Sequence, residues 1–186
     1  HDWVTAFPDT PNGYDDYFVK ATKGANVLLN TEIEEYDLPK KRVKIRGEWK
    51  QYDVIVNTIS LDRAFENCYG TLPFIGLDFY PIVLPVKQLL PDNIFFLYYS
   101  GKEKHKRIVE YKKFFKNENP YTLIGFEVPS LNGGYYALPI SKFHKLHKQY
   151  EELLPENVFS IGRAGSYQYI DIDDCIDQAM KVIKSL

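Results

Sequence analysis

The chain has 186 residues, a length that suits one ordinary domain or two small lobes sharing a core. Its net charge of −2 leaves no basic excess to neutralise a phosphate backbone, so nucleic acid is not an expected partner. Cys68 and Cys175 are too few for a disulfide framework and indicate reduced thiols. No signal peptide or apolar run of transmembrane length is apparent, which predicts a cytoplasmic protein without a membrane partner. Because the chain begins with His1 and its one methionine is Met180, we expect a part of a longer protein.

Aromatic residues make up 16% of the chain, with 15 Tyr and 12 Phe. A tyrosine offers a flat ring and a hydroxyl group, which suit a sugar or a ring-shaped ligand. The same composition also describes the core of a strand-rich protein, so both interpretations stay open.

The first 60 residues predict a helix followed by several strands. After an irregular start over residues 1–11, residues 12–23 suit a helix that Gly24 ends. Residues 26–30 suit a strand, residues 42–45 and 48–52 a hairpin around Arg46-Gly47, and residues 52–60 a strand buried at Val54, Ile55 and Val56. This order is typical of the second half of flavin-binding Rossmann-like domains.

The rest of the chain predicts an antiparallel sheet and two helices. Five strand-like runs separated by turn residues cover residues 79–86, 93–100, 107–115, 121–130 and 135–140. Residues 141–154 suit an amphipathic helix with Ser141 as its N-cap, and residues 157–162 a short strand. From Asp171 onward we expect a helix with a buried stripe of Ile172, Ile176, Ala179, Met180 and Ile183. The predicted fold class is therefore α+β (mixed α/β), a partial Rossmann-like lobe with an antiparallel sheet lobe.

The segment from Phe159 to Asp174 is the first candidate for chemistry. A strand ends at Gly162, a glycine-bearing turn follows, and a helix begins near Asp171, so free N–H groups at the helix start favour a polar or anionic ligand. Arg163 adds a forked donor suited to phosphate. An ordinary strand-to-helix connection explains the pattern equally well.

Arg107 is the second candidate. It lies on a predicted strand and alternates with Val109, which favours an inward or cleft-facing side chain. The alternative is a surface arginine that follows the basic stretch of residues 102–106.

Other kinds of site are not predicted. His144 and His147 are three residues apart on a helix, but no third ligand accompanies them, so we expect no metal. The sequence contains no GxSxG, HExxH, GxGxxG or P-loop motif.

Several segments together resemble the UDP-galactopyranose mutase family. GRAGSYQYIDID resembles the GRLxEYxYYDMD signature of these enzymes, and RIVEYKKFF resembles their TRIxEHKxF segment. YDVIVNTIS, NVLLNTEI and FPDTPNGY resemble further family segments, in the family's order and from about Phe7 to the end. Ser166 replaces the signature's Glu and Ile170 one of its Tyr residues.

The resemblance implies roles for individual residues. Gly162, Arg163 and Asp171 correspond to flavin-binding positions, and Asp171 and Arg107 to catalytic ones. Arg107 and Tyr169 correspond to residues that bind the UDP diphosphate, with Tyr136 as a candidate for a further substrate-binding tyrosine. Residues 1–72 and 155–186 would then belong to an FAD-binding lobe, and residues 73–154 to a substrate-side lobe.

The implied activity is an isomerase that interconverts UDP-galactopyranose and UDP-galactofuranose for cell-surface polysaccharide biosynthesis. In the family, N5 of reduced FAD is thought to attack the anomeric carbon of the sugar. The expected partners are a UDP-sugar, the family's amino-terminal half if it exists, and a second copy of the chain. The family's GxGxxG motif and helical domain have no counterpart in these residues, so we expect the isolated chain to be inactive and to bind FAD weakly. The alternative is a non-catalytic nucleotide-sugar-binding or interaction module derived from the same fold.

Overall fold

The computed structural model describes residues 8, 10, 12–115 and 118–186, which form two compact units. Unit 1 comprises residues 1–29 and 77–129, and unit 2 comprises residues 30–76 and 130–186. The predicted irregular segment at residues 1–11 lies almost entirely outside the described residues. Within the described part of the chain, no helix is long and apolar enough to cross a membrane.

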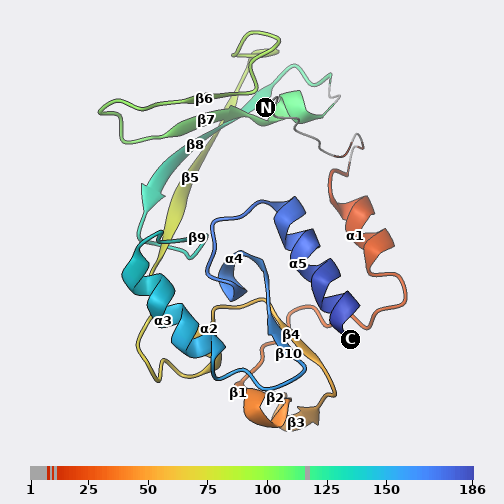
Figure 1. Cartoon of the computed structure of the whole chain (residues 1–186). Helices are drawn as coiled ribbons and strands as arrows, with labels where there is room; N and C mark the ends of the chain where they lie inside the picture. The colour runs from red at the N-terminus through yellow and green to blue at the C-terminus, as the bar shows by residue number, and fades with distance from the viewer. Residues whose placement is uncertain (1–7, 9, 11, 116–117) are drawn as a thin grey trace. The chain divides into compact units, whose positions relative to one another are not determined.

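Unit 1 holds most of an antiparallel sheet (Figure 1). Its elements are α1 (Asp15–Ala21), β5 (Phe74–Leu84, which begins in unit 2), β6 (Phe96–Tyr98), β7 (Arg107–Glu110), the 3-10 helix η2 (Tyr111–Phe114) and β8 (Thr122–Ser130). The hydrogen-bonded order is β6-β7-β8-β5-β9, where β9 (Tyr136–Ala137) pairs antiparallel with the first residues of β5 in unit 2. β7 is antiparallel to both of its neighbours. A strand is present in each of the five predicted runs, and the α+β class is confirmed. The third strand is shorter than predicted, because residues 111–114 form η2.

Unit 2 combines a hairpin sheet, a parallel strand pair and helices. Its elements are β1 (Glu35–Asp37), the 3-10 helix η1 (Leu38–Lys40), β2 (Arg42–Ile45), β3 (Glu48–Gln51), β4 (Ile55–Asn57), α2 (Leu61–Ala64), α3 (Ser141–Glu151), β10 (Val158–Ser160), α4 (Gly162–Gly165) and α5 (Ile172–Ser185). The predicted hairpin is confirmed: Arg46 and Gly47 have φ of 51° and 77°, as a two-residue type I′ turn requires. β10 pairs with β4 in parallel.

Several predicted boundaries are wrong. The first helix is shorter than residues 12–23, and residues 26–30 do not form a strand. Val27, Leu28 and Leu29 in this segment are at least half exposed. Val56 on β4 is exposed and not buried as predicted. Ile140, not Ser141, is the N-cap of α3.

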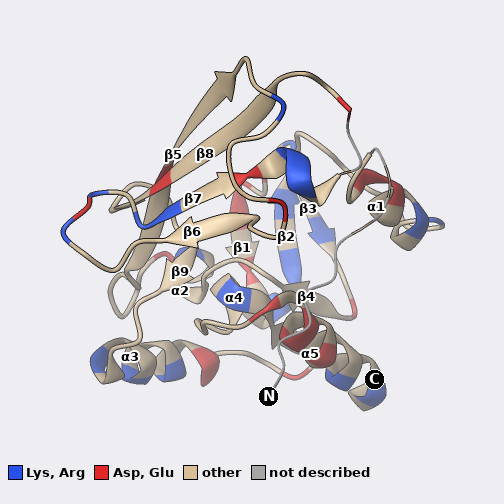
Figure 2. Cartoon of the chain, turned by 90° about the horizontal axis from the view of Figure 1, so that it is seen from above, with Lys and Arg blue, Asp and Glu red and all other residues tan. Residues whose placement is uncertain are grey.

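The predicted burial along α5 is also wrong. Ile172, Ile176, Met180 and Ile183 are between 48% and 67% exposed, while Val182, on a neighbouring face of the helix, is buried. The ends of the helix follow the expected electrostatics: Asp173 and Asp174 lie in the first turn and Lys184 in the last (Figure 2). α5 therefore packs against the rest of unit 2 along a narrower face than its sequence predicts.

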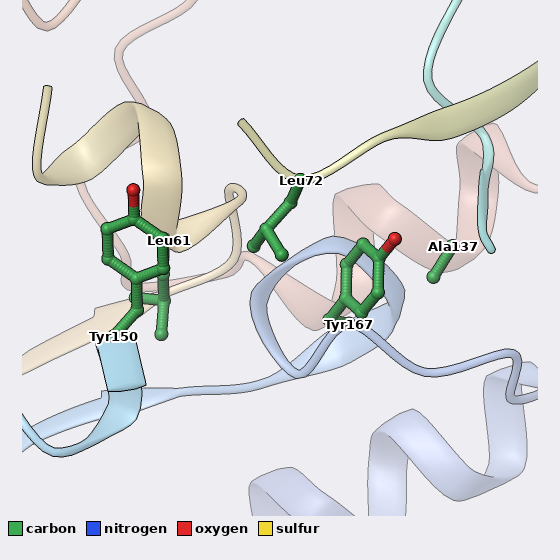
Figure 3. Packing of buried hydrophobic residues seen from close by; sticks show 5 residues of the cluster. All are labelled: Leu61, Leu72, Ala137, Tyr150 and Tyr167. Carbon is green, nitrogen blue, oxygen red and sulfur yellow. The ribbon is translucent and has the colours of Figure 1, made fainter. Parts of the chain in front are cut away.

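The main core of unit 2 gathers around two buried tyrosines (Figure 3). Tyr150 of α3 and Tyr167, which follows α4, pack with Leu61, Leu72 and Ala137. Because both hydroxyl groups donate to backbone carbonyls, Tyr150 to Gly70 and Tyr167 to Pro73, no polar cost of burial remains. Segments far apart in sequence are thus joined at one point.

A buried carboxylate organises unit 1. Glu110 accepts hydrogen bonds from the backbone N–H groups of Leu89 and Leu90, each at 2.8 Å, and from the Thr122 hydroxyl at 2.7 Å. Nζ of Lys113 lies 3.6 Å from Oε2 of Glu110. Burial by itself raises the pKa of Glu110, but the hydrogen bonds and the positive charge outweigh it and hold that pKa below its ordinary value.

We therefore expect unit 1 to lose stability in acid. Because the folded-state pKa of Glu110 is lowered, its contribution is complete above the unfolded pKa of about 4.3 and is lost as pH falls through the folded value. Glu110→Gln should cost about 2 kcal/mol or more at neutral pH, since an amide N–H₂ faces groups that donate. Thermal melts of both proteins from pH 7 to pH 3 should converge at the acid end. A difference in melting temperature between the two proteins that stays constant from pH 7 to pH 3 contradicts this role of the ionised Glu110.

Candidate functional site

Arg107 forms the centre of a cross-strand row in unit 1. In the sheet register it pairs with Tyr98 of β6 on one side and with Glu127 of β8 on the other. Its Nε and Nη2 donate to the two carboxylate oxygens of Glu127 at 2.8 and 2.7 Å, a bidentate pair. Its Nη1 donates to the Tyr98 hydroxyl at 3.3 Å. The strands therefore fix the plane of the guanidinium.

The electrostatics keep Arg107 charged and leave one edge for a ligand. Partial burial lowers the pKa of Arg107, but the hydrogen bonds with Glu127 and Tyr98 more than offset this, and the net pKa lies above its ordinary value. Glu127 is buried, whereas Tyr98 is exposed. Because Glu127 occupies Nε and Nη2, an anion would approach Arg107 from the Nη1 side, next to the Tyr98 hydroxyl.

Arg163 forms a second cluster, within unit 2. Its guanidinium carbon lies 5.4 Å from the ring centre of Tyr136 and 5.5 Å from that of Tyr169, and the two rings are 5.4 Å apart. Both distances suit cation–π contact. Nη2 donates to the Asp171 carboxylate at 3.0 Å, and Nε donates to the Ile170 carbonyl. A fixed cation thus lies against exposed aromatic surface.

The local backbone explains this placement. Gly162 follows β10 with φ of 76°, a left-handed conformation that glycine adopts without strain, and turns the chain into α4. Asp171 is the N-cap of α5 and shares a capping box with Asp174. Arg163, in the short helix α4, therefore bonds to the N-cap residue of the longer helix α5.

Sequence reasoning missed Gln178, which closes this region. Its Oε1 accepts from the Gly162 N–H at 2.7 Å, and its Nε2 donates to the Ser166 hydroxyl at 3.3 Å. Ser166 in turn donates to the Gly162 carbonyl at 2.8 Å. The residue that replaces the family's Glu thus stabilises the turn, and the N–H of Gly162 already has a partner.

The structure brings most of the predicted site residues together. Tyr136, Arg163, Tyr169 and Asp171 form one cluster in unit 2, and Gly162 precedes Arg163 in the same helix. Arg107 belongs to unit 1 and has its own partners there. Tyr98 and Glu127 were missed, although pairing the predicted strands would have placed them opposite Arg107.

The two histidines of α3 have structural neighbours. His144 and His147 both contact the ring of Tyr167, with ring centres 5.6 and 5.8 Å away. Among the residues that the structure describes, no three His, Cys, Asp or Glu side chains are grouped as metal ligands.

Each of the two clusters presents a fixed guanidinium beside tyrosine rings. The family model for UDP-galactopyranose mutase matches residues 2–169. The chain therefore belongs to the UDP-galactopyranose mutase family. The match ends at Tyr169, so the correspondence of Asp171 rests on the motif itself.

The chain is similar to parts of two larger proteins. It is 24% identical over 174 residues to the dTDP-fucopyranose mutase of Escherichia coli, a match that covers 83% of this chain and 44% of that protein. A crystal structure of reduced UDP-galactopyranose mutase superposes with a TM-score of 0.69 at 12% identity, covering 88% of this chain and 47% of that one. The shared fold is thus established, and the chain spans about half the length of these relatives.

Proposed function

We propose that the chain carries flavin-binding and nucleotide-sugar-binding residues of an FAD-dependent mutase that interconverts UDP-galactopyranose and UDP-galactofuranose. The observation that carries the proposal is the Arg163 cluster, in which a fixed guanidinium lies against Tyr136 and Tyr169 and is bound to Asp171. Four residues that the family resemblance assigns to ligands meet there, although they are up to 35 positions apart in sequence. In this proposal residues 1–72 and 155–186 serve the flavin side and residues 73–154 the substrate side.

The donor set of unit 2 fits a flavin. An isoalloxazine ring is flat and carries carbonyl groups, so aromatic rings and a fixed guanidinium are suitable neighbours. Arg163 and Asp171 would hold it, and bound FAD would supply a nucleophile for the anomeric carbon of the sugar. The Gly162 N–H fits less well, because Gln178 already accepts from it. We therefore assign Gly162 to the turn that places Arg163.

Arg107 and Tyr169 are assigned to the UDP diphosphate. A departing UDP carries developing negative charge, and a cation fixed beforehand stabilises that charge without reorganising. Arg107 meets this requirement because the Glu127 pair fixes its plane and its charge. Tyr169 offers a hydroxyl group on a side chain that is largely exposed. Each residue then positions the diphosphate, and neither needs to gain or lose a proton.

A second candidate is a module that binds nucleotide sugars without catalysis. It is favoured by the lack of a GxGxxG motif in these 186 residues, since that motif forms the usual cradle for the FAD pyrophosphate. This candidate predicts binding of UDP without binding of flavin.

Titration of the chain with FAD, read by flavin fluorescence, separates the two candidates. We expect a saturable change of low affinity that Arg163→Ala removes, because the guanidinium would no longer face the flavin. Arg63→Ala is the matched control, since Arg63 is an exposed arginine of the same unit. If the folded chain shows no saturable change but still binds UDP, the flavin part of the proposal is wrong and the binding module is favoured.

A further inference from the structure

The chain between Arg163 and Asp171 forms an arm whose middle is buried. Tyr167 is fully buried and has φ of 50°, a conformation that non-glycine residues rarely adopt. A side chain at Gly165 would place its Cβ 2.9 Å from the Ser160 hydroxyl and 3.0 Å from the Asn57 carbonyl. Residues 165–167 are therefore held against the core, while Arg163 and Tyr169 on either side reach the candidate site.

His147 of α3 contacts both buried points of this arm. Its Nε2 lies 2.9 Å from the Gly165 carbonyl oxygen, and its ring is stacked on Tyr167 at 5.8 Å and 20°. A carbonyl oxygen can only accept, so Nε2 must carry a hydrogen and donate. The His147 side chain is 5% exposed. The histidine therefore combines a directed donor with a flat surface for the tyrosine.

We propose that His147 is a positioning residue, which sets the arm so that the guanidinium of Arg163 lies against Tyr136 and Tyr169. The arm transmits the constraint because it closes on itself: the Gln168 N–H donates to the Arg163 carbonyl at 3.2 Å, and Arg163 Nε donates to the Ile170 carbonyl. A shift of Gly165 would therefore move both Arg163 and Tyr169, the two residues that contact each other. The effect on ligand binding rests on the proposed function, whereas the effect on Arg163 does not.

Two substitutions separate the donor from the ring. His147→Phe keeps a flat ring for Tyr167 and loses the hydrogen bond, whereas His147→Gln keeps an N–H₂ donor near the place of Nε2. Tyr150→Phe is the control, because Tyr150 lies on the same helix as His147. It removes the hydroxyl group that bonds to Gly70 and Tyr69, and it leaves the arm untouched. If His147 had only a structural role, His147→Phe and Tyr150→Phe would have similar effects on the arm.

The first readout needs no ligand. The Arg163 Nε–H signal, assigned by Arg163→Lys in ¹H–¹⁵N spectra, should be shifted by the two tyrosine rings and protected from exchange by Ile170. We expect His147→Phe to remove the shift and the protection, and His147→Gln and Tyr150→Phe to retain them. An unchanged signal in His147→Phe, or its loss in Tyr150→Phe as well, overturns the proposal.

The second readout is FAD affinity. His147→Phe should weaken binding by about tenfold, and His147→Gln should restore most of it, as expected when one oriented hydrogen bond is lost. If the wild-type chain does not bind FAD, the proposed function fails, and the Arg163 signal still decides the role of His147.

Discussion

Replacing Tyr167 with alanine is expected to lower the free energy of unfolding of unit 2 by about 3–5 kcal/mol, the usual cost of removing a large buried aromatic side chain. Tyr167 is fully buried and packs edge-on against Phe74 with ring centres 5.2 Å apart. Its hydroxyl donates to the Pro73 carbonyl at 2.7 Å, which would lose that donor. The ring of His147, which is stacked on Tyr167, loses that contact as well.

Two related variants show how much of this loss of stability comes from the ring of Tyr167. Tyr167→Phe should cost only about 1 kcal/mol, since the ring stays and a single hydrogen bond is lost. Tyr169→Ala should change stability little, because that ring is 69% exposed. Urea denaturation followed by circular dichroism measures all three. A Tyr167→Ala protein that unfolds within about 1 kcal/mol of wild type would show that this core is not closed around the tyrosine.

Replacing Arg107 with alanine should weaken UDP binding by about 10- to 150-fold, as expected for one charge-assisted hydrogen bond of about 1.5–3 kcal/mol. The cause is the loss of a cation whose plane is fixed by Glu127 before the ligand arrives. Arg107→Lys should recover part of the affinity, since it restores the charge but not the fork. Isothermal titration calorimetry at constant salt measures the difference.

Lys106→Ala is the matched control for Arg107. It removes the same charge from the neighbouring position, where the lysine is exposed. Equal losses of affinity in the two variants would indicate general electrostatic attraction, and an unchanged affinity in Arg107→Ala would remove Arg107 from the site. Circular dichroism must accompany the titration to show that Arg107→Ala still folds, because this substitution leaves the Glu127 carboxylate without the Arg107 donors.

The sequence predicted the parts of this fold that depend on local pattern. The hairpin around Arg46-Gly47 follows from a turn that few residue pairs can make, and the five sheet strands follow from their regular punctuation. The start of α5 follows from the acidic residues that cap it. These signals act over a few residues and need no knowledge of distant neighbours.

Features that depend on distant partners were predicted less well. Residues 26–30 have strand-like composition, but a strand exists only where another strand pairs with it, and β1 begins further along at Glu35. The apolar stripe of α5 is real, yet its exposure depends on what packs against it. Glu127 and Gln178 act on Arg107 and Gly162 through register and packing, which a linear pattern does not contain.

The candidate site divides in the same way. Arg107, Arg163, Tyr169 and Asp171 stand in recognisable motifs, so a resemblance could name them. The ring contact of Tyr136 with Tyr169 required the structure, since the sequence left the position of that tyrosine open. Their roles toward flavin and diphosphate remain predictions.

The measurement that tests the central claim most directly is a calorimetric titration of the folded chain with UDP, with uridine as the comparison. We predict saturable binding of UDP, and much weaker binding of uridine, because the proposed contacts of Arg107 and Tyr169 are to the diphosphate. Equal binding of the two compounds, or no binding of UDP by a chain that melts cooperatively, would contradict the roles proposed for Arg107 and for Tyr169 toward the diphosphate.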